Sequence, residues 1–171
     1  MQKEEPQFLV NPYGDPVMIQ VHGKASFLNS APVKELFDRL VMQGKKRFVL
    51  DFQNCTGMDS TFLGILAGLG ITMMNEQPAG SVVLCRLGER NLELIENLGL
   101  NRLLVVDKAE KLPGHPGTGD LKALDKGHKL SEIENARLVL KAHESLVEAD
   151  PSNKAKFQDV ITFLKSQMEG Q

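Results

Sequence analysis

The chain has 171 residues and a mass of 18.9 kDa, and its 42% hydrophobic and 25% charged residues are typical of a folded protein. Its 20 basic and 22 acidic residues give a net charge of -2, which leaves no basic field for nucleic acid. No stretch approaches the ~20 apolar residues that cross a bilayer. The N-terminal residues 1–7 are polar and acidic, unlike a secretory signal, and two cysteines without CxxC spacing indicate a reducing compartment. We therefore expect a cytoplasmic protein without a disulfide framework.

The predicted elements begin with a hairpin and a helix. Apolar runs over residues 8–10 and 17–23, separated by a Tyr-Gly-Asp-Pro turn, predict two strands that can pair with each other. Asn29 or Ser30 then caps a helix, whose apolar residues recur at helical spacing until Gly44 ends it.

Strands and helices alternate from there. The pattern predicts a strand over 48–52, a helix over 59–73, a strand over 81–85, a short helix over 89–98 and a last strand over 103–106. Such alternation indicates a mostly parallel sheet with helices packed on it, to which the first two strands add an antiparallel edge. We therefore predict an α/β fold with a mostly parallel sheet of four to five strands.

The C-terminal third changes character. Lys, Asp, Gly and Pro dominate residues 111–130, which predicts a linker after a domain over 1–110. Residues 131–171 form a predicted helical extension, in which a capping box opens the first helix and Asp-Pro at 150–151 separates it from the second. Two such helices cannot bury both of their apolar stripes alone. They pack on the sheet domain, on a second copy as a homodimer, or on another protein.

The junction Asp59-Ser60-Thr61 joins a buried strand to a helix, at the edge of the sheet where open parallel sheets form binding sites. The first turn of a helix has unpaired N–H groups and favours negative charge, so a phosphate on Ser60 is tolerated there. Asp59 or Ser60 can equally be an ordinary helix cap, and the two interpretations are compatible. The small residues Gly64 and Gly68 in the same helix predict close packing against the sheet.

Metal, cofactor and catalytic motifs are not recognisable. The four histidines are widely spaced and form no HxxxH or HExxH pattern, so we expect no metal site and take His143 as a surface or packing residue. Cys55 has no evident base beside it and is expected to pack. No dinucleotide, P-loop or GxSxG motif occurs, so we expect no cofactor and no enzymatic activity.

Residues 8–110 resemble a STAS domain, the fold of bacterial anti-sigma factor antagonists. The resemblance rests on the segment 58–64, Met-Asp-Ser-Thr-Phe-Leu-Gly, which follows the strand Phe-Val-Leu-Asp-Phe at 48–52. It also rests on the segment 92–103, Leu-Glu-Leu-Ile-Glu-Asn-Leu-Gly-Leu-Asn-Arg-Leu. The resemblance implies a STAS-like sheet over this stretch, and the predicted C-terminal helical hairpin is an addition to it.

The resemblance also implies a function in transcription regulation and signal transduction. It puts a phosphorylated serine at Ser60, and it implies an anti-sigma factor serine kinase and a serine phosphatase as partners. The expected partner-binding residues are Met58, Asp59, Thr61 and Phe62 around the serine, together with Ser26 and Phe27 in the preceding loop. Phe62 is either a partner anchor at the surface or a residue of the core.

Two other functions stay open at this stage. In one, the strand-end loops bind a nucleotide, an anion or a lipid at the helix N-terminus, with Phe27 and Phe62 lining the pocket, and the protein is a sensing or scaffold module. In the other, the protein is an α/β enzyme that uses Asp59 or Cys55, against which the absence of a paired base argues.

Overall fold

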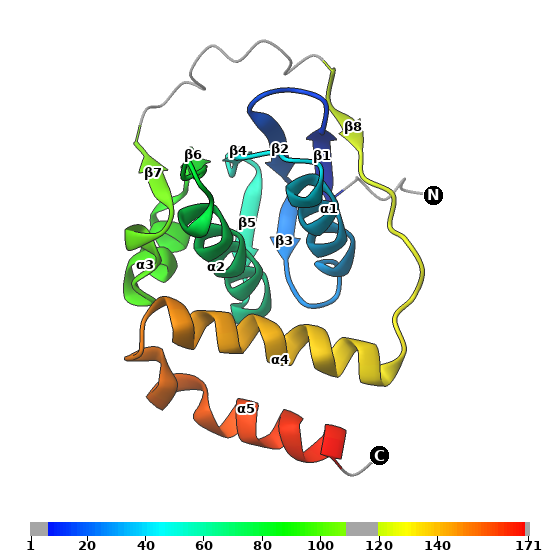
Figure 1. Ribbon diagram of the computed structural model, residues 1–171, viewed down its shortest axis with the longest axis vertical. Coiled ribbons are helices and arrows are strands. Elements are labelled where there is room, and N and C mark those ends of the chain that lie inside the picture. The colour runs from blue at the N-terminus through cyan, green and yellow to red at the C-terminus, as the bar shows by residue number, and fades with distance from the viewer. Residues whose placement is uncertain (1–6, 109–119, 170–171) are drawn as a thin grey trace.

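The computed structural model describes residues 7–108 and 120–169, and the statements on structure below concern those residues. One six-stranded sheet has the order β7-β6-β4-β2-β1-β8 (Figure 1). Its strands are β1 (Phe8–Asn11), β2 (Val17–Val21), β4 (Arg47–Asp51), β6 (Ser81–Cys85), β7 (Val105–Asp107) and β8 (Lys122–Ala123). Strands β2, β4, β6 and β7 run parallel, while β1 is antiparallel to both β2 and β8. The predicted α/β fold is confirmed, including its antiparallel edge.

The sheet has a strand in a segment that the sequence assigned to a linker. Of the expected linker 111–130, residues up to 119 lie outside the described part of the chain, and residues 120–130 carry β8. This strand pairs with β1, and the Leu124 N–H donates to the Phe8 carbonyl at 3.0 Å. Its two residues are too few to show any strand periodicity, which is why the sequence pattern missed it.

Side chains of the central strands alternate between the two faces of the sheet, as the period of two requires. Ile19 and Leu50 belong to the main hydrophobic core, whereas Met18, Val49 and Cys85 form a small cluster on the other face. Four α-helices contribute buried residues to the main core: α1 (Ala31–Met42), α2 (Ser60–Asn75), α3 (Glu89–Asn97) and, through Ala142 and Leu146, α4 (Glu132–Ala149). A short 3-10 helix, η1 (Leu100–Arg102), follows α3.

A second, two-stranded sheet lies at the edge where the candidate site forms. Strands β3 (Gly23–Ala25) and β5 (Cys55–Met58) pair in parallel, with Ala25 opposite Met58. Neither segment was predicted as a strand of its own, because each is too short to show a strand periodicity. Their pairing places the loop after β3 directly beside the start of α2.

The C-terminal hairpin packs on the sheet domain. This is one of the three packing partners that the sequence left open, beside a second copy and another protein. Helix α4 (Glu132–Ala149) lies across α2, and α5 (Asn153–Glu169) lies on the outer side of α4 (Figure 1). The predicted capping box of Ser131 and Glu134 opens α4. At the turn before α5, the Asn153 side-chain amide donates to the carbonyls of Leu98 (2.9 Å) and Leu146 (2.8 Å). Among the described residues, no helix has the length and apolar character needed to cross a membrane.

Candidate functional site

Asp59 holds the candidate site together. It is the N-cap of α2, and its Oδ1 accepts a hydrogen bond from the Phe62 N–H at 2.9 Å. Its Oδ2 accepts a second one from the Phe27 N–H at 2.8 Å, and its own N–H donates to the Ala25 carbonyl at 3.0 Å. One carboxylate therefore caps the helix and fixes the loop after β3.

Ser60 is the first residue of α2 and is half-buried. Its Oγ lies 2.8 Å from Nε2 of His143, on the C-terminal helix α4. The other ring nitrogen of His143, Nδ1, lies 2.6 Å from the Val139 carbonyl oxygen. A carbonyl oxygen only accepts, so we assign the proton to Nδ1, and Nε2 of the neutral ring then accepts from the Ser60 hydroxyl.

His143 is the site residue that sequence reasoning missed. It lies 83 positions from Ser60 in the chain and belongs to no spacing motif. It is only 3% exposed, and its ring packs edge-on against Phe157 at 5.1 Å between ring centroids. The expectation of a surface or packing histidine is therefore incomplete, because the ring packs and also bonds to the predicted switch serine.

The structure brings the other predicted site residues together but buries most of them. Met58, Thr61 and Ser26 are almost fully covered, at 7%, 3% and 7% exposure. Phe62 takes the inward alternative: it has no exposed surface, and its ring stacks on Phe8 with centroids 6.0 Å apart. The expectation that these four side chains contact a partner is therefore corrected: they are buried and support the site from beneath. Phe27, at 47% exposure, is the one of the six predicted contact residues with an exposed ring.

Three small residues on α2 form the surface on which α4 sits. Ser60, Gly64 and Gly68 follow each other at intervals of four and so share one face of the helix, which we call the switch face. A Cβ at Gly64 would clash with the Ala142 carbonyl oxygen, and a Cβ at Gly68 would lie 3.3 Å from the Ser145 Oγ. The glycines therefore serve the contact with α4, which corrects the expectation of helix–sheet packing.

The two thiols do not form a reactive site. Burial raises the pKa of the Cys55 thiol above its usual value. Burial and then the nearby carboxylates of Asp107 and Asp51 raise the pKa of Cys85 to about 11. A nucleophilic cysteine needs a lowered pKa, so both thiols behave as packing residues. The described residues contain no group of three or more His, Cys, Asp or Glu side chains that could hold a metal ion.

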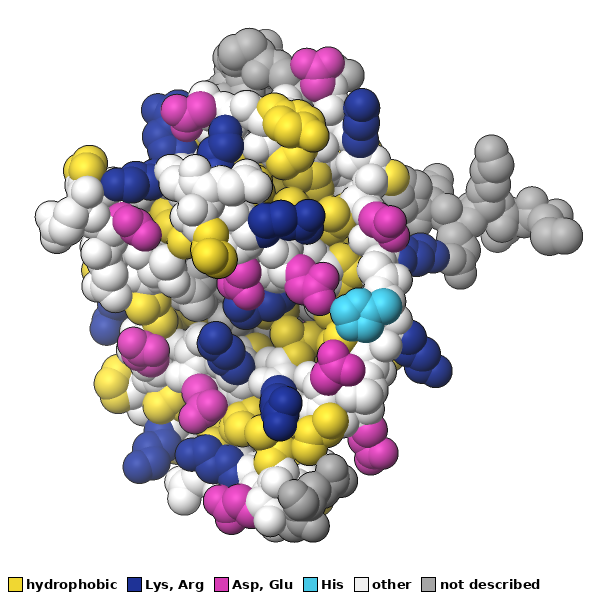
Figure 2. Space-filling view, turned by 45° about the vertical axis from the view of Figure 1, so that its right-hand side comes forward, with side chains coloured by type: hydrophobic (Ala, Val, Ile, Leu, Met, Phe, Trp, Pro, Cys, Tyr) yellow, Lys and Arg dark blue, Asp and Glu magenta, His cyan; other side chains and the backbone are white. Residues whose placement is uncertain are grey.

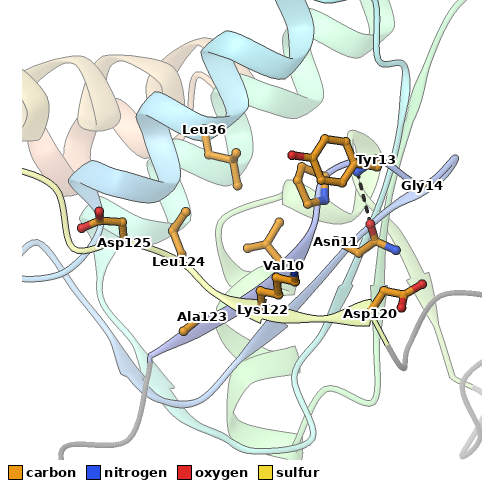
Figure 3. A pocket seen from close by; sticks show the side chains of 11 residues that line it. Val10, Asn11, Tyr13, Gly14, Leu36, Asp120, Lys122, Ala123, Leu124 and Asp125 are labelled. Atoms are coloured by element: carbon orange, nitrogen blue, oxygen red, sulfur yellow. Dashed lines mark hydrogen bonds between the residues drawn. The ribbon is translucent and has the colours of Figure 1, made fainter.

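A groove of about 710 Å³ lies away from Ser60, between β1, β8 and α1 (Figure 3). Its apolar lining includes Val10, Leu36 and Leu124, and Asp120 and Asp125 stand near its ends. None of the residues predicted to bind a partner or a small ligand lines it. The outer surface in Figure 2 mixes Lys and Arg with Asp and Glu, so this face carries no patch of a single charge sign.

Comparisons with known proteins agree with this arrangement. A family model for the STAS domain matches residues 7–112. The solved structure of the anti-sigma factor antagonist SpoIIAA in its unphosphorylated form aligns with a TM-score of 0.50 and 16% identity, over 60% of this chain and 88% of that chain. A Thermotoga maritima protein assigned as an anti-sigma factor antagonist aligns with a TM-score of 0.51 and 16% identity, over 60% and 87%. SpoIIAA of Bacillus in its phosphorylated form gives 0.49 and 18%, over 60% and 93%.

At 16% sequence identity, the likeness to these solved structures shows a shared fold and does not show a shared function. No curated protein sequence matches the chain. The family match ends at residue 112, before α4 begins at Glu132, so the helical hairpin lies outside it.

Proposed function

Because the chain belongs to the STAS domain family, we propose that it is a non-enzymatic protein-interaction module whose binding is switched by phosphorylation of Ser60. The solved structures with the same fold include anti-sigma factor antagonists. By analogy, we propose that the unphosphorylated chain binds an anti-sigma factor serine kinase and that a serine phosphatase restores this form.

The observation that carries the proposal is the difference between two adjacent hydroxyl groups. Ser60 is half-buried at the N-terminus of α2, while Thr61 is 3% exposed and faces the interior. A kinase must reach the hydroxyl that it modifies, so Ser60 is the better acceptor of the pair. Phosphorylation adds about -1.5 to -2 charges, which the unpaired first-turn N–H groups of a helix tolerate.

The charge also explains how phosphorylation would end binding. A partner surface that has lost its water cannot solvate a new phosphate unless it offers a paired cation. Phe27, which is 47% exposed and is fixed by Asp59, supplies apolar contact area beside the serine. A partner that covers Phe27 and Ser60 together is therefore sensitive to the phosphate.

The alternative of a small-ligand sensor receives less support. It needed Phe27 and Phe62 to line a pocket at the start of α2, and Phe62 is fully buried against Phe8. The groove in Figure 3 lies elsewhere and shares no residue with that site.

Peptide-level mass spectrometry of the protein isolated from its own cells tests the proposal. We expect phosphate on Ser60 and none on Thr61. In binding assays with the kinase, Ser60→Asp should weaken the complex at least tenfold, while Ser60→Ala should bind as the unphosphorylated chain does. Phosphate on Thr61, or equal affinity of the two variants, would contradict the assignment of Ser60 as the switch.

A further inference from the structure

The switch face of α2 is already occupied within the chain. Helix α4 lies against Ser60, Gly64 and Gly68, and its backbone comes so close that Gly64 has no space for a Cβ beside the Ala142 carbonyl. This is the tight approach of two helices through small residues, and a single added methyl group disturbs it. We propose that the hairpin of α4 and α5 is an intramolecular cover of the switch face, and that phosphorylation of Ser60 releases it. The inference rests on the proposed function only in taking Ser60 as the modified residue.

The first reason is the hydrogen bond that phosphorylation removes. The Ser60 hydroxyl donates to Nε2 of His143, whose Nδ1 is engaged by the Val139 carbonyl. In phosphoserine the hydroxyl proton is replaced by the phosphoryl group, so Oγ becomes an ester oxygen without a proton. Two acceptors then face each other across the former 2.8 Å bond, and His143, at 3% exposure, is cut off from water as a substitute partner.

The second reason is charge and volume. The phosphoryl group brings about two negative charges next to Asp59, whose carboxylate is fixed by two backbone N–H groups and cannot turn away. The interface is packed to backbone contact at Gly64, and the groove of about 440 Å³ between α1, α2 and α4 does not include Ser60 in its lining. Separation of α4 from α2 relieves the crowding and admits water, which screens the repulsion between the phosphate and Asp59.

The third reason is that no strand of the described sheets lies in the hairpin, although Ala142 and Leu146 of α4 belong to the main core. The second attachment of the hairpin is at the far end of α4, where the Asn153 amide donates to the Leu98 and Leu146 carbonyls and the Lys156 ammonium donates to the Asn97 carbonyl at 2.8 Å. The bonds to Leu98 and Asn97 are polar contacts to the end of α3, whereas the bond to Leu146 lies within the hairpin. Phosphorylation would therefore end the kinase contact at Phe27 and Ser60, and it would also free Gly64 and Gly68, which α4 covers.

Hydrogen exchange on the full chain tests the cover. The chain is produced with phosphoserine encoded at position 60 and compared with the unmodified chain by mass spectrometry. We expect amides of residues 132–149 to exchange at least tenfold faster, while those of β2 and β4 keep their protection. Phosphoserine at position 166, where the serine is exposed on α5, is the matched control and should leave α4 protected.

The opposite result has a clear physical meaning. If His143 took up a proton and paired with the phosphate, α4 would be held more tightly and its exchange would slow. Slower or unchanged exchange in the chain phosphorylated at position 60 would overturn the proposal.

A pair of glycine variants tests the cover without any phosphate. Gly64→Ala improves the helix propensity of α2 but places a methyl group against the Ala142 backbone. Gly68→Ala meets only the Ser145 side chain, and its nearest atom, the Oγ, can rotate away. We expect at least tenfold faster exchange in α4 for Gly64→Ala and less than threefold for Gly68→Ala. Equal hydrogen exchange of the α4 amides in the two variants would show that α4 does not depend on close packing against Gly64, and it would overturn the proposal.

These experiments separate the cover from the proposed function. If Ser60 carries no phosphate in cells, the proposed switch fails, yet the encoded phosphoserine and the Gly64→Ala chain still report whether α4 is a releasable cover. If α4 stays seated in both chains while Ser60 is phosphorylated in cells, the cover fails and the switch remains.

Discussion

Helices α2 and α5 have nearly the same length but very different attachments to the molecule. Of the 16 residues of α2, ten are buried, whereas of the 17 residues of α5 only Asn153 and Leu164 are buried. Buried apolar area provides most of the free energy that holds an element in place. Helix α2 is therefore part of the core, and α5 is held through α4 and a few polar contacts.

The candidate switch serine lies on the boundary between these two regions. Ser60 belongs to α2 by backbone and touches α4 by its side chain. Local opening free energies in a protein range from near zero up to the global value, and segments with few buried contacts open first. A modification at this boundary can therefore free the hairpin while the sheet domain stays folded.

The largest expected effect comes from removing a core ring of α2. Phe62→Ala deletes a fully buried side chain that stacks on Phe8, and we expect the free energy of unfolding to fall by about 3–5 kcal/mol. Phe163→Ala on α5 removes a ring that is 61% exposed, and the loss should stay within about 0.5 kcal/mol. Urea denaturation of the two variants measures both. Similar losses of unfolding free energy in the two variants would contradict the difference in burial between α2 and α5.

An intermediate effect is expected at the anchor of the hairpin. Asn153→Ala leaves the Leu98 and Leu146 carbonyls without their buried donor, which costs about 1–3 kcal/mol. Because the contact joins the hairpin to the end of α3, faster hydrogen exchange should be confined to α4, α5 and that end. Ser152→Ala, one residue earlier and exposed, is the control and should have little effect. Loss of protection throughout the sheet would show instead that the hairpin is part of one cooperative core.

The smallest expected effect concerns the thiols. With its pKa raised to about 11 by burial and nearby carboxylates, Cys85 is about one part in a thousand thiolate at pH 8. Iodoacetamide should therefore label it very slowly in the native chain, and faster as the pH rises toward 11. Since Cys85 packs with Met18 and Val49 on the sheet, release of the hairpin in Gly64→Ala should not change the rate. Rapid labelling of native Cys85 at pH 8 would contradict its burial.

Much of the fold was predictable because its signals are local. Alternating apolar runs indicated the central strands, and a capping box indicated the start of α4. The strands that the sequence missed, β3, β5 and β8, have three, four and two residues. Such short segments carry no periodicity, and their pairing depends on which parts of the chain the fold brings alongside.

The sequence by itself determined the sheet domain, the helical hairpin and the start of a helix at residues 59–61, because periodicity and caps act within a few residues. Tertiary structure alone decided that Phe62 turns inward, that Gly64 accommodates the backbone of α4 and that His143 reaches Ser60. Those outcomes depend on how two helices far apart in the chain pack together. No local pattern records that packing, because the contact surface exists only after the sheet domain has assembled and α4 lies across it.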